Sequence, residues 1–369
     1  MNRLSAIDAF GPAFARVGTM LFTRFRLSSW LKMGFIGFLG GGLVAASGGS
    51  FNFRLPMFNP RVPPSHPPEG RVPLGPMDLD RFLRSIHLGD YFHIALIVLA
   101  TVVVTGLIFQ YLFCRFRFIL FDSIITGEPA IGPGWRKYAS QANRYFGFWL
   151  VYRLVNWGVM VLIIGLPLLR AYKSGVFSGE NSLPAFFAVI ASIALGALCA
   201  SIIFAIVSTL AKDFVMPVLA LDDLQLGDAW SAVWRVVASE PGAWAAYMAL
   251  KLVAAIGTSI AFFIAFIIAM LPASIVIGIP AGILLVAGIL AFKAIGTLAG
   301  IIICSLAGLL LAAGFFCIFL VLSAPVSVFF GSFAFYFFGG RYPKLAALLW
   351  PQPLPPAPQA QPASVQPAL

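Results

Sequence analysis

Stretches of about 20 apolar residues, almost free of charge, recur along this chain and constrain its fold more than any other feature. The longest of them, residues 243–338, carries only two charged side chains, Lys251 and Lys293. A helix of about 20 residues crosses the hydrocarbon core of a bilayer, and it pairs its own backbone groups where no water is available. The sequence therefore predicts an all-α, polytopic membrane protein built as a bundle of transmembrane helices.

Composition excludes two other classes of protein. Charged residues make up 10% of the 369 residues and hydrophobic residues 60%, whereas a soluble domain carries about 25% charged residues. This excludes a soluble enzyme, and it excludes intrinsic disorder over most of the length. The net charge is +11, but the basic residues lie in short segments beside apolar stretches. That pattern is typical of membrane topology signals, so no nucleic-acid partner is expected.

We expect about eight transmembrane helices. The first four are predicted over residues 30–46, 93–113, 147–169 and 185–210. The stretch 243–338 is long enough for four more, at about 20–25 residues per crossing. Turn signals in this stretch place the breaks at Pro272, near Lys293 and at Ser323–Pro325.

Further segments precede the first helix, follow it and end the chain. Residues 1–29 are predicted to form a cytoplasmic amphipathic lead-in, either an interfacial helix or the approach to the first span. A signal peptide cut near Ala45–Ala46 is the alternative, which the long lead-in with its Asp8 disfavours. Residues 47–92 are rich in proline and are expected to form an extended extracytoplasmic loop. Residues 351–369 are expected to form a disordered, proline-rich tail.

Basic residues beside the spans predict the orientation. They place residues 114–146, Lys293 and the pair Arg341 and Lys344 on the cytoplasmic side. Residues 211–242 fall on the same side and are expected to form a polar loop with a short helix. The sequence therefore predicts a protein of the bacterial inner membrane with both termini in the cytoplasm.

The chain contains an internal repeat with an offset of 95 residues. Five pairs of identical residues follow it: Gly132 and Gly227, Trp135 and Trp230, Gly147 and Gly242, Trp149 and Trp244, Tyr152 and Tyr247. Phe118 and Phe214 form a further pair with one residue of slippage. We expect two parallel helix–loop–helix units, near residues 93–169 and 185–270.

Several hydrophobic strings resemble a known family. They are Arg24-Phe25-Arg26, Trp30-Leu31-Lys32, Ser50-Phe51-Asn52-Phe53, the run Arg115 to Asp122, the run Lys212 to Pro217, and the run Phe335 to Tyr342. Together they resemble an uncharacterised bacterial multi-pass family, similar to the membrane domain of some glycerophosphodiester phosphodiesterases. The resemblance covers most of residues 20–345 and implies about six spans. The excess would be an inserted hairpin at 271–308, which either crosses twice or is re-entrant. The resemblance implies no activity.

No residue pattern predicts catalysis, a cofactor or a metal. The four cysteines include no CxxC pair, and the chain has neither a GxSxG nor an HExxH motif. A membrane hydrolase would need His66 or His87 to converge with Asp78 and Asp80, and their spacing is not that of metal ligands. We therefore expect a protein that is not an enzyme.

Two sets of side chains are candidate sites. Arg115, Arg117, Arg136 and Lys137 are predicted to hold anionic lipid head groups, unless they serve only to set the topology. Tyr152, Arg153, Tyr247 and Lys251 are predicted to line a cavity, unless Arg153 and Lys251 extend to the head groups from near the helix ends.

The acidic residues allow one further hypothesis. Asp122 and the pair Asp222-Asp223 end apolar strings, where they either cap the following segment or pair with Arg115 or Arg117 to clamp the two repeats together. No acidic residue is expected in the middle of a span, which disfavours an ion-coupled carrier. The sequence favours a scaffold or lipid-interacting assembly factor, with membrane lipids and a membrane protein as partners. The alternative is a transporter or channel for a small solute.

Overall fold

The computed structural model describes residues 4–23, 25–41, 88–176 and 182–350. In those residues every regular element is a helix. The expected loop at 47–92 and the expected tail at 351–369 lie outside them, apart from the first residues of α5. The helices are α1 Phe10–Val17, η1 Gly18–Phe22, α2 Leu27–Leu39, α5 Leu88–Thr126, α6 Ile131–Lys137, α7 Ala139–Lys173, α8 Ser182–Leu210, η2 Ala211–Val215, α9 Met216–Asp222, α10 Leu226–Ser239, α11 Pro241–Val276, α12 Gly278–Ala294, α13 Thr297–Gly339 and α14 Pro343–Leu349.

Five helical segments of this part of the chain are long and apolar enough to cross a membrane. They are Ala95–Thr126, Ala139–Lys173, Leu183–Asp222, Pro241–Val276 and Thr297–Gly339. Two shorter helices, α2 and α12, are also apolar. The expected spans 93–113, 147–169 and 185–210 lie inside α5, α7 and α8. A helical membrane protein is therefore confirmed in outline.

The apolar stretch 243–338 forms three helices instead of the four expected. Pro272 lies inside α11, which continues to Val276, and α13 passes without a break through Pro325. Proline is tolerated in membrane helices, because neighbouring groups satisfy the backbone carbonyl that it leaves unpaired. The break expected at Ser323–Pro325 is therefore wrong, although the surroundings of α13 do change there.

α13 consists of two parts with different surroundings. Its last 20 residues, Leu320–Gly339, are largely buried, whereas Thr297–Phe319 is mostly exposed. The buried part packs against α1, α2, η2, α5 and α14. We call this packed region the hub. It is made of the short helices α1, η1, α2, α6, η2, α9, α10 and α14, with Gln110–Thr126 of α5, the first turns of α7 and α11, and Leu320–Gly339 of α13.

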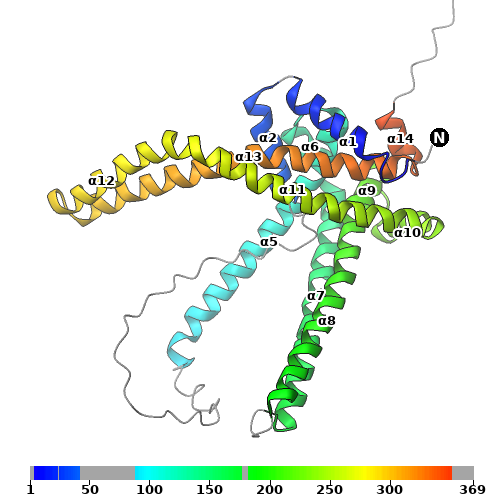
Figure 1. Cartoon of the computed structure of the whole chain (residues 1–369), viewed down its shortest axis with the longest axis horizontal. Helices are drawn as coiled ribbons and strands as arrows, with labels where there is room; N and C mark the ends of the chain where they lie inside the picture. Colours follow the sequence, from blue (N-terminus) through cyan, green and yellow to red (C-terminus); the bar gives the residue numbers. More distant parts are fainter. Residues whose placement is uncertain (1–3, 24, 42–87, 177–181, 351–369) are drawn as a thin grey trace, which may run out of the picture.

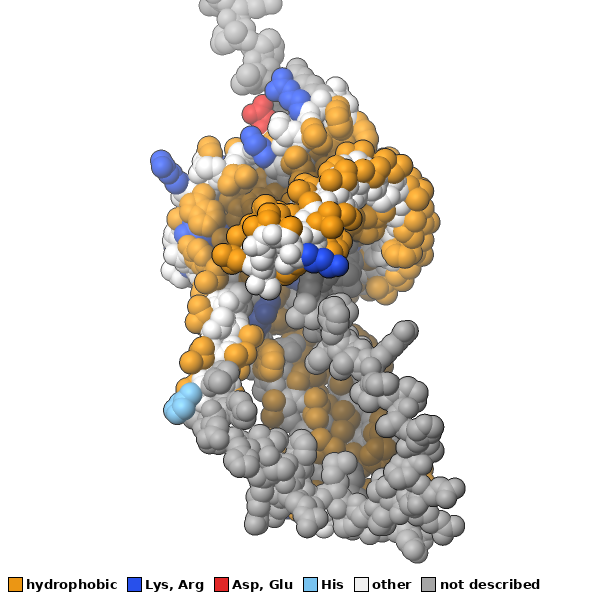
Figure 2. Space-filling view, turned by 90° about the vertical axis from the view of Figure 1, so that its left-hand side faces the viewer, with side chains coloured by type: hydrophobic (Ala, Val, Ile, Leu, Met, Phe, Trp, Pro, Cys, Tyr) orange, Lys and Arg blue, Asp and Glu red, His pale blue; other side chains and the backbone are white. Residues whose placement is uncertain are grey.

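Apolar helices leave the hub in different directions (Figure 1): α5 extends alone, and two further groups form what we call the arms. One is the pair α7 and α8, which lie side by side, and the other is α12 with the outer part of α13. Figure 2 views the molecule from the side of the second arm and shows mostly apolar side chains with isolated basic ones. Large apolar side chains on both arms are exposed, among them Leu154, Leu195, Ile283 and Leu298. Surfaces of this kind suit contact with lipid or with other membrane helices.

Small residues permit the closest helix contacts. A Cβ atom on Gly34 of α2 would lie 2.0 Å from the backbone oxygen of Leu320. In the second arm, a Cβ on Gly288 of α12 would lie 2.5 Å from the Sγ atom of Cys304 on α13. Glycine at these positions therefore lets the backbones approach, as is common between membrane helices.

Candidate functional site

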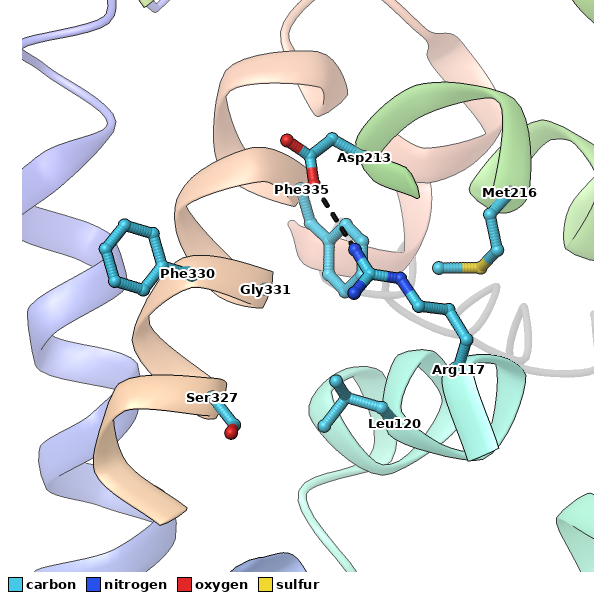
Figure 3. A pocket seen from close by; sticks show the side chains of 8 residues that line it. All are labelled: Arg117, Leu120, Asp213, Met216, Ser327, Phe330, Gly331 and Phe335. Carbon is cyan, nitrogen blue, oxygen red and sulfur yellow. Dashed lines mark hydrogen bonds and ion pairs between the residues drawn. The ribbon is translucent and has the colours of Figure 1, made fainter. Parts of the chain in front are cut away.

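A buried carboxylate lies where three helical segments meet. Asp213 is on η2, a short π-helical turn between α8 and α9, and its side chain is 2% exposed. Its Oδ1 atom is 3.3 Å from Nη2 of Arg117 on α5 (Figure 3). Its Oδ2 atom accepts a hydrogen bond of 2.9 Å from the hydroxyl of Tyr247 and pairs with Nζ of Lys251, both on α11. We call Arg117, Asp213, Tyr247 and Lys251 the Asp213 cluster.

Arg117 extends this cluster to a fourth element. Its Nη1 atom donates to the backbone oxygen of Gly40 at the end of α2, at 3.2 Å. Its Nη2 atom also donates to the backbone oxygen of Lys212, at 3.1 Å. The guanidinium therefore joins α2, α5 and η2. A planar group with several donors suits this role better than an ammonium group does.

A small cavity adjoins the cluster. It has a volume of about 10 Å³ and is lined by Arg117 and Asp213 with six residues from α5, α9 and α13: Leu120, Met216, Ser327, Phe330, Gly331 and Phe335. Among the described residues, Nε of Arg117 and Oγ of Ser327 have no hydrogen-bond partner. The cavity is about the size of one water molecule.

The residues predicted to line one cavity divide between two places. Tyr247 and Lys251 contact Asp213, whereas the hydroxyl of Tyr152 donates to the backbone oxygen of Phe204 on α8, at 2.6 Å. Arg153 follows Tyr152 on α7 and is exposed. The structure therefore joins Tyr247 to Lys251 and keeps Tyr152 in contact with the first arm.

The residues predicted to hold lipid head groups also divide. Arg115 is 8% exposed, and its Nε and Nη2 atoms donate to the hydroxyl of Tyr111 at 2.9 and 2.7 Å. Its guanidinium also lies 5.2 Å from the ring centroid of Trp135. Arg115 and Arg117 therefore bind inside the hub, whereas Arg136 and Lys137 lie exposed on α6.

The three acids expected to clamp the repeats bind other basic residues. Asp122 accepts hydrogen bonds from Nζ of Lys137 at 2.7 Å and from the hydroxyl of Tyr138 at 2.9 Å. Asp222 pairs with Lys344, and Oδ1 of Asp223 lies 3.1 Å from Nη1 of Arg144. The hypothesis that these acids pair with Arg115 or Arg117 is therefore wrong.

The acid that does pair with Arg117 is Asp213, which the sequence analysis missed. Residues 211–242 were expected to form a polar loop, but Asp213 lies within the apolar helical segment Leu183–Asp222. The repeat contained a signal for it. Arg117 precedes Phe118 and Asp213 precedes Phe214, so the two charges occupy corresponding positions in the two units.

No group of three or more metal-ligating side chains occurs among the residues that the structure describes. His66 and His87, with Asp78 and Asp80, lie outside those residues. The structure therefore does not test the hydrolase hypothesis, which stays a prediction from the sequence.

The contact between α6 and α5 gives a pH prediction. The hydrogen bond that Lys137 donates to Asp122 raises the pKa of Lys137 above its usual 10.5. The contact therefore stabilises the fold below pH 10.5, and this stabilisation is lost as the pH rises through the raised pKa. At neutral pH we expect the wild-type protein to have a higher melting temperature than the Lys137→Gln variant. Above the raised pKa of Lys137 the two melting temperatures should be equal. The Lys137 side chain is 59% exposed, so the difference in the free energy of unfolding should stay below about 1 kcal/mol. Melting temperatures measured from pH 7 to 12 test this, and a difference that persists at pH 12 contradicts it.

Comparison with known proteins places the chain in a family. The model of the family DUF7544, described as a family of unknown function, matches residues 4–348. No curated protein and no solved structure matches the chain. The match spans the hub and both arms, and it shows no link to glycerophosphodiester phosphodiesterases.

Proposed function

We propose that this chain, which belongs to the DUF7544 family of unknown function, is a non-enzymatic scaffold or lipid-interacting assembly factor of the bacterial inner membrane. One observation carries the proposal. Buried ion pairs join the helices of the hub, while the two apolar arms leave it in different directions with many large apolar side chains exposed (Figure 1). A scaffold requires a rigid centre and several separate surfaces for other helices or lipids.

Six crossings fit this role better than the eight that the sequence suggests. α5, α7, α8, α11 and α13 would each cross once. The predicted span 30–46, which begins in α2, would supply the sixth crossing, and α12 would be re-entrant. An even number of crossings leaves both termini on the same side of the membrane, which we take to be the cytoplasmic side. The basic residues Arg136, Lys137 and Arg144 then lie on the cytoplasmic side, in accordance with the positive-inside rule.

The order of the helices supports two repeated units. α5, α6 and α7 form one sequence of long, short and long helices, and α8, α10 and α11 form a similar one. Trp149 and Trp244 occupy matching positions near the starts of α7 and α11, and both are buried, at 5% and 3% exposure. The pair Arg117 and Asp213 would then join one unit to the other.

Native mass spectrometry of protein extracted from its own membrane under mild conditions tests the scaffold proposal. We expect a protein or lipid partner in fixed stoichiometry with the chain. Arg136→Ala combined with Lys137→Ala should weaken lipid retention, because both side chains are exposed on α6. Arg170→Ala with Lys173→Ala, at the other end of α7, is the matched control and should leave lipid retention unchanged. A bare protein, or lipid retention that both double variants lower equally, contradicts the proposal.

A second candidate function is transport of a small solute. The observation in its favour is the Asp213 cluster, because charged groups within membrane-spanning segments commonly mark a pathway. Flux of small ions and polar solutes from liposomes tests it. A flux that Lys251→Met abolishes, and that the control Lys293→Met leaves intact, would favour the transporter over the scaffold.

A further inference from the structure

One face of α7 forms a wall beside Lys212. Trp149, Tyr152 and Arg153 are spaced by three and four residues, so they lie on the same face of the helix. The ring centroid of Trp149 is 5.0 Å from that of Tyr152 and 5.6 Å from that of Phe113 on α5. Nζ of Lys212 lies 5.3 Å from the Trp149 centroid and 5.9 Å from the Phe113 centroid. The ammonium group therefore rests against aromatic rings of two helices.

Arg153 brings a second positive charge to this place. It lies one turn beyond Trp149 on the same face of α7, and Nζ of Lys212 lies against the Trp149 ring, so the two cations flank one aromatic side chain. Two cations that share one site repel each other, and aromatic rings compensate only a small part of a positive charge. The site therefore attracts an anion.

Among the described residues, no acidic side chain forms an ion pair with either of these two cations. Neither Arg153 nor Lys212 forms an ion pair or a side-chain hydrogen bond with a described residue, whereas the neighbouring Arg117 and Lys251 share Asp213. The carboxylate of Asp213 is already occupied, since Oδ1 pairs with Arg117 and Oδ2 with Tyr247 and Lys251. Arg117 and Lys251 thus already share this carboxylate, and Lys212 and Arg153 are left without one.

We propose that Arg153 and Lys212 together bind one phosphate group, supplied by a lipid head group or by free phosphate. The guanidinium offers paired donors that match phosphate oxygens, and the ammonium adds a compact charge. Basic pockets between membrane helices bind lipid head groups in this way. Val151 and Leu154, on either side of Arg153 on α7, are 60% and 66% exposed and would contact the acyl chains. The inference rests on the membrane placement proposed above.

Binding to the purified full-length chain in detergent tests this site. The probes are phosphatidylglycerol, phosphatidylcholine and inorganic phosphate. Arg153→Gln and Lys212→Gln should each lower affinity for the bound probe about fivefold, and the double variant should lower it further than either single variant. The matched controls are Arg170→Gln on the same helix and Lys293→Gln at the end of α12, both exposed. Lys212→Arg keeps the charge and should keep the binding.

The probes separate the two sources of phosphate. Variant-sensitive binding of phosphatidylglycerol that millimolar phosphate does not displace supports a lipid, and variant-sensitive binding of inorganic phosphate alone supports a free anion. Equal losses in the controls, or unchanged binding in Arg153→Gln, overturn the proposal. If Lys212→Gln does not fold, Arg153→Gln decides the result, because its side chain is exposed. Native mass spectra of the wild-type protein report any bound protein partner independently of these probes, so failure of this site is distinguishable from failure of the scaffold proposal.

Discussion

Asp213→Ala should destabilise the protein by about 3–5 kcal/mol, the largest effect expected of a single substitution in the hub. The carboxylate balances Arg117 and Lys251, which are almost fully buried with it. Removing one member of a buried ion pair leaves its partners charged and without compensation, and that penalty is of the stated size. The effect is measured by thermal unfolding of the purified protein in detergent. The readout is the loss of the monodisperse peak in size-exclusion chromatography.

Two further variants make this prediction specific. Asp228→Ala removes an exposed acid in the first turn of α10 and should change stability by less than about 1 kcal/mol. Asp213→Leu combined with Arg117→Met and Lys251→Met removes all three charges and should recover much of the lost stability. If the triple variant is no more stable than Asp213→Ala, the loss does not come from unpaired charge.

Gly34→Ala should lower stability by about 1–3 kcal/mol, although alanine is the better helix former. The added Cβ would lie 2.0 Å from the oxygen and 2.7 Å from the carbonyl carbon of Leu320. These are backbone atoms of α13, so no side-chain rotation relieves the contact and α2 must move away. The expected result is an earlier unfolding transition in the same detergent assay.

Gly106→Ala is the matched control for this substitution. Gly106 also lies in an apolar helix, α5, but a Cβ there has no neighbour within 4 Å. Its replacement should leave stability unchanged or raise it by up to about 1 kcal/mol, since glycine is unfavourable inside a helix. Equal shifts in the two variants would contradict the close contact between α2 and α13.

The sequence predicted which segments are helical and apolar, but it did not predict which of them are buried in protein. α13 illustrates the reason. Ile302 and Leu309 in its outer part face outward, whereas Phe330 and Phe333 in its inner part are buried in the hub. In a membrane protein the lipid-facing and protein-facing residues are equally apolar, so composition does not separate them. The sequence therefore predicts a turn at Pro325, which lies inside the continuous helix α13.

The candidate site was only partly within reach of the sequence. Lys251 is a candidate because it is a charge inside an apolar segment, and Tyr247 is one because it matches Tyr152 in the repeat. Asp213 was missed because acids are expected at helix ends, and its helical segment continues for nine more residues to Asp222. Lys212 was missed for the same reason, because residues 211–242 are predicted as a polar loop and Lys212 lies in the helical segment Leu183–Asp222. Which cations share a carboxylate and which lack one is a matter of three-dimensional contact, and single-sequence patterns do not contain it.

The buried part of α13 has a consequence for the synthesis of the protein. The first helices pack against the last long one, and Arg341 donates a hydrogen bond of 3.0 Å to the backbone oxygen of Leu4, 337 positions earlier. At about 5–20 residues per second, translation separates these partners by some tens of seconds. During that interval the part of α13 against which α1 and α2 pack has not yet been synthesised. The hub therefore assembles only as the ribosome finishes the chain, and a truncated product would expose its aromatic interior to the quality-control machinery of the cell.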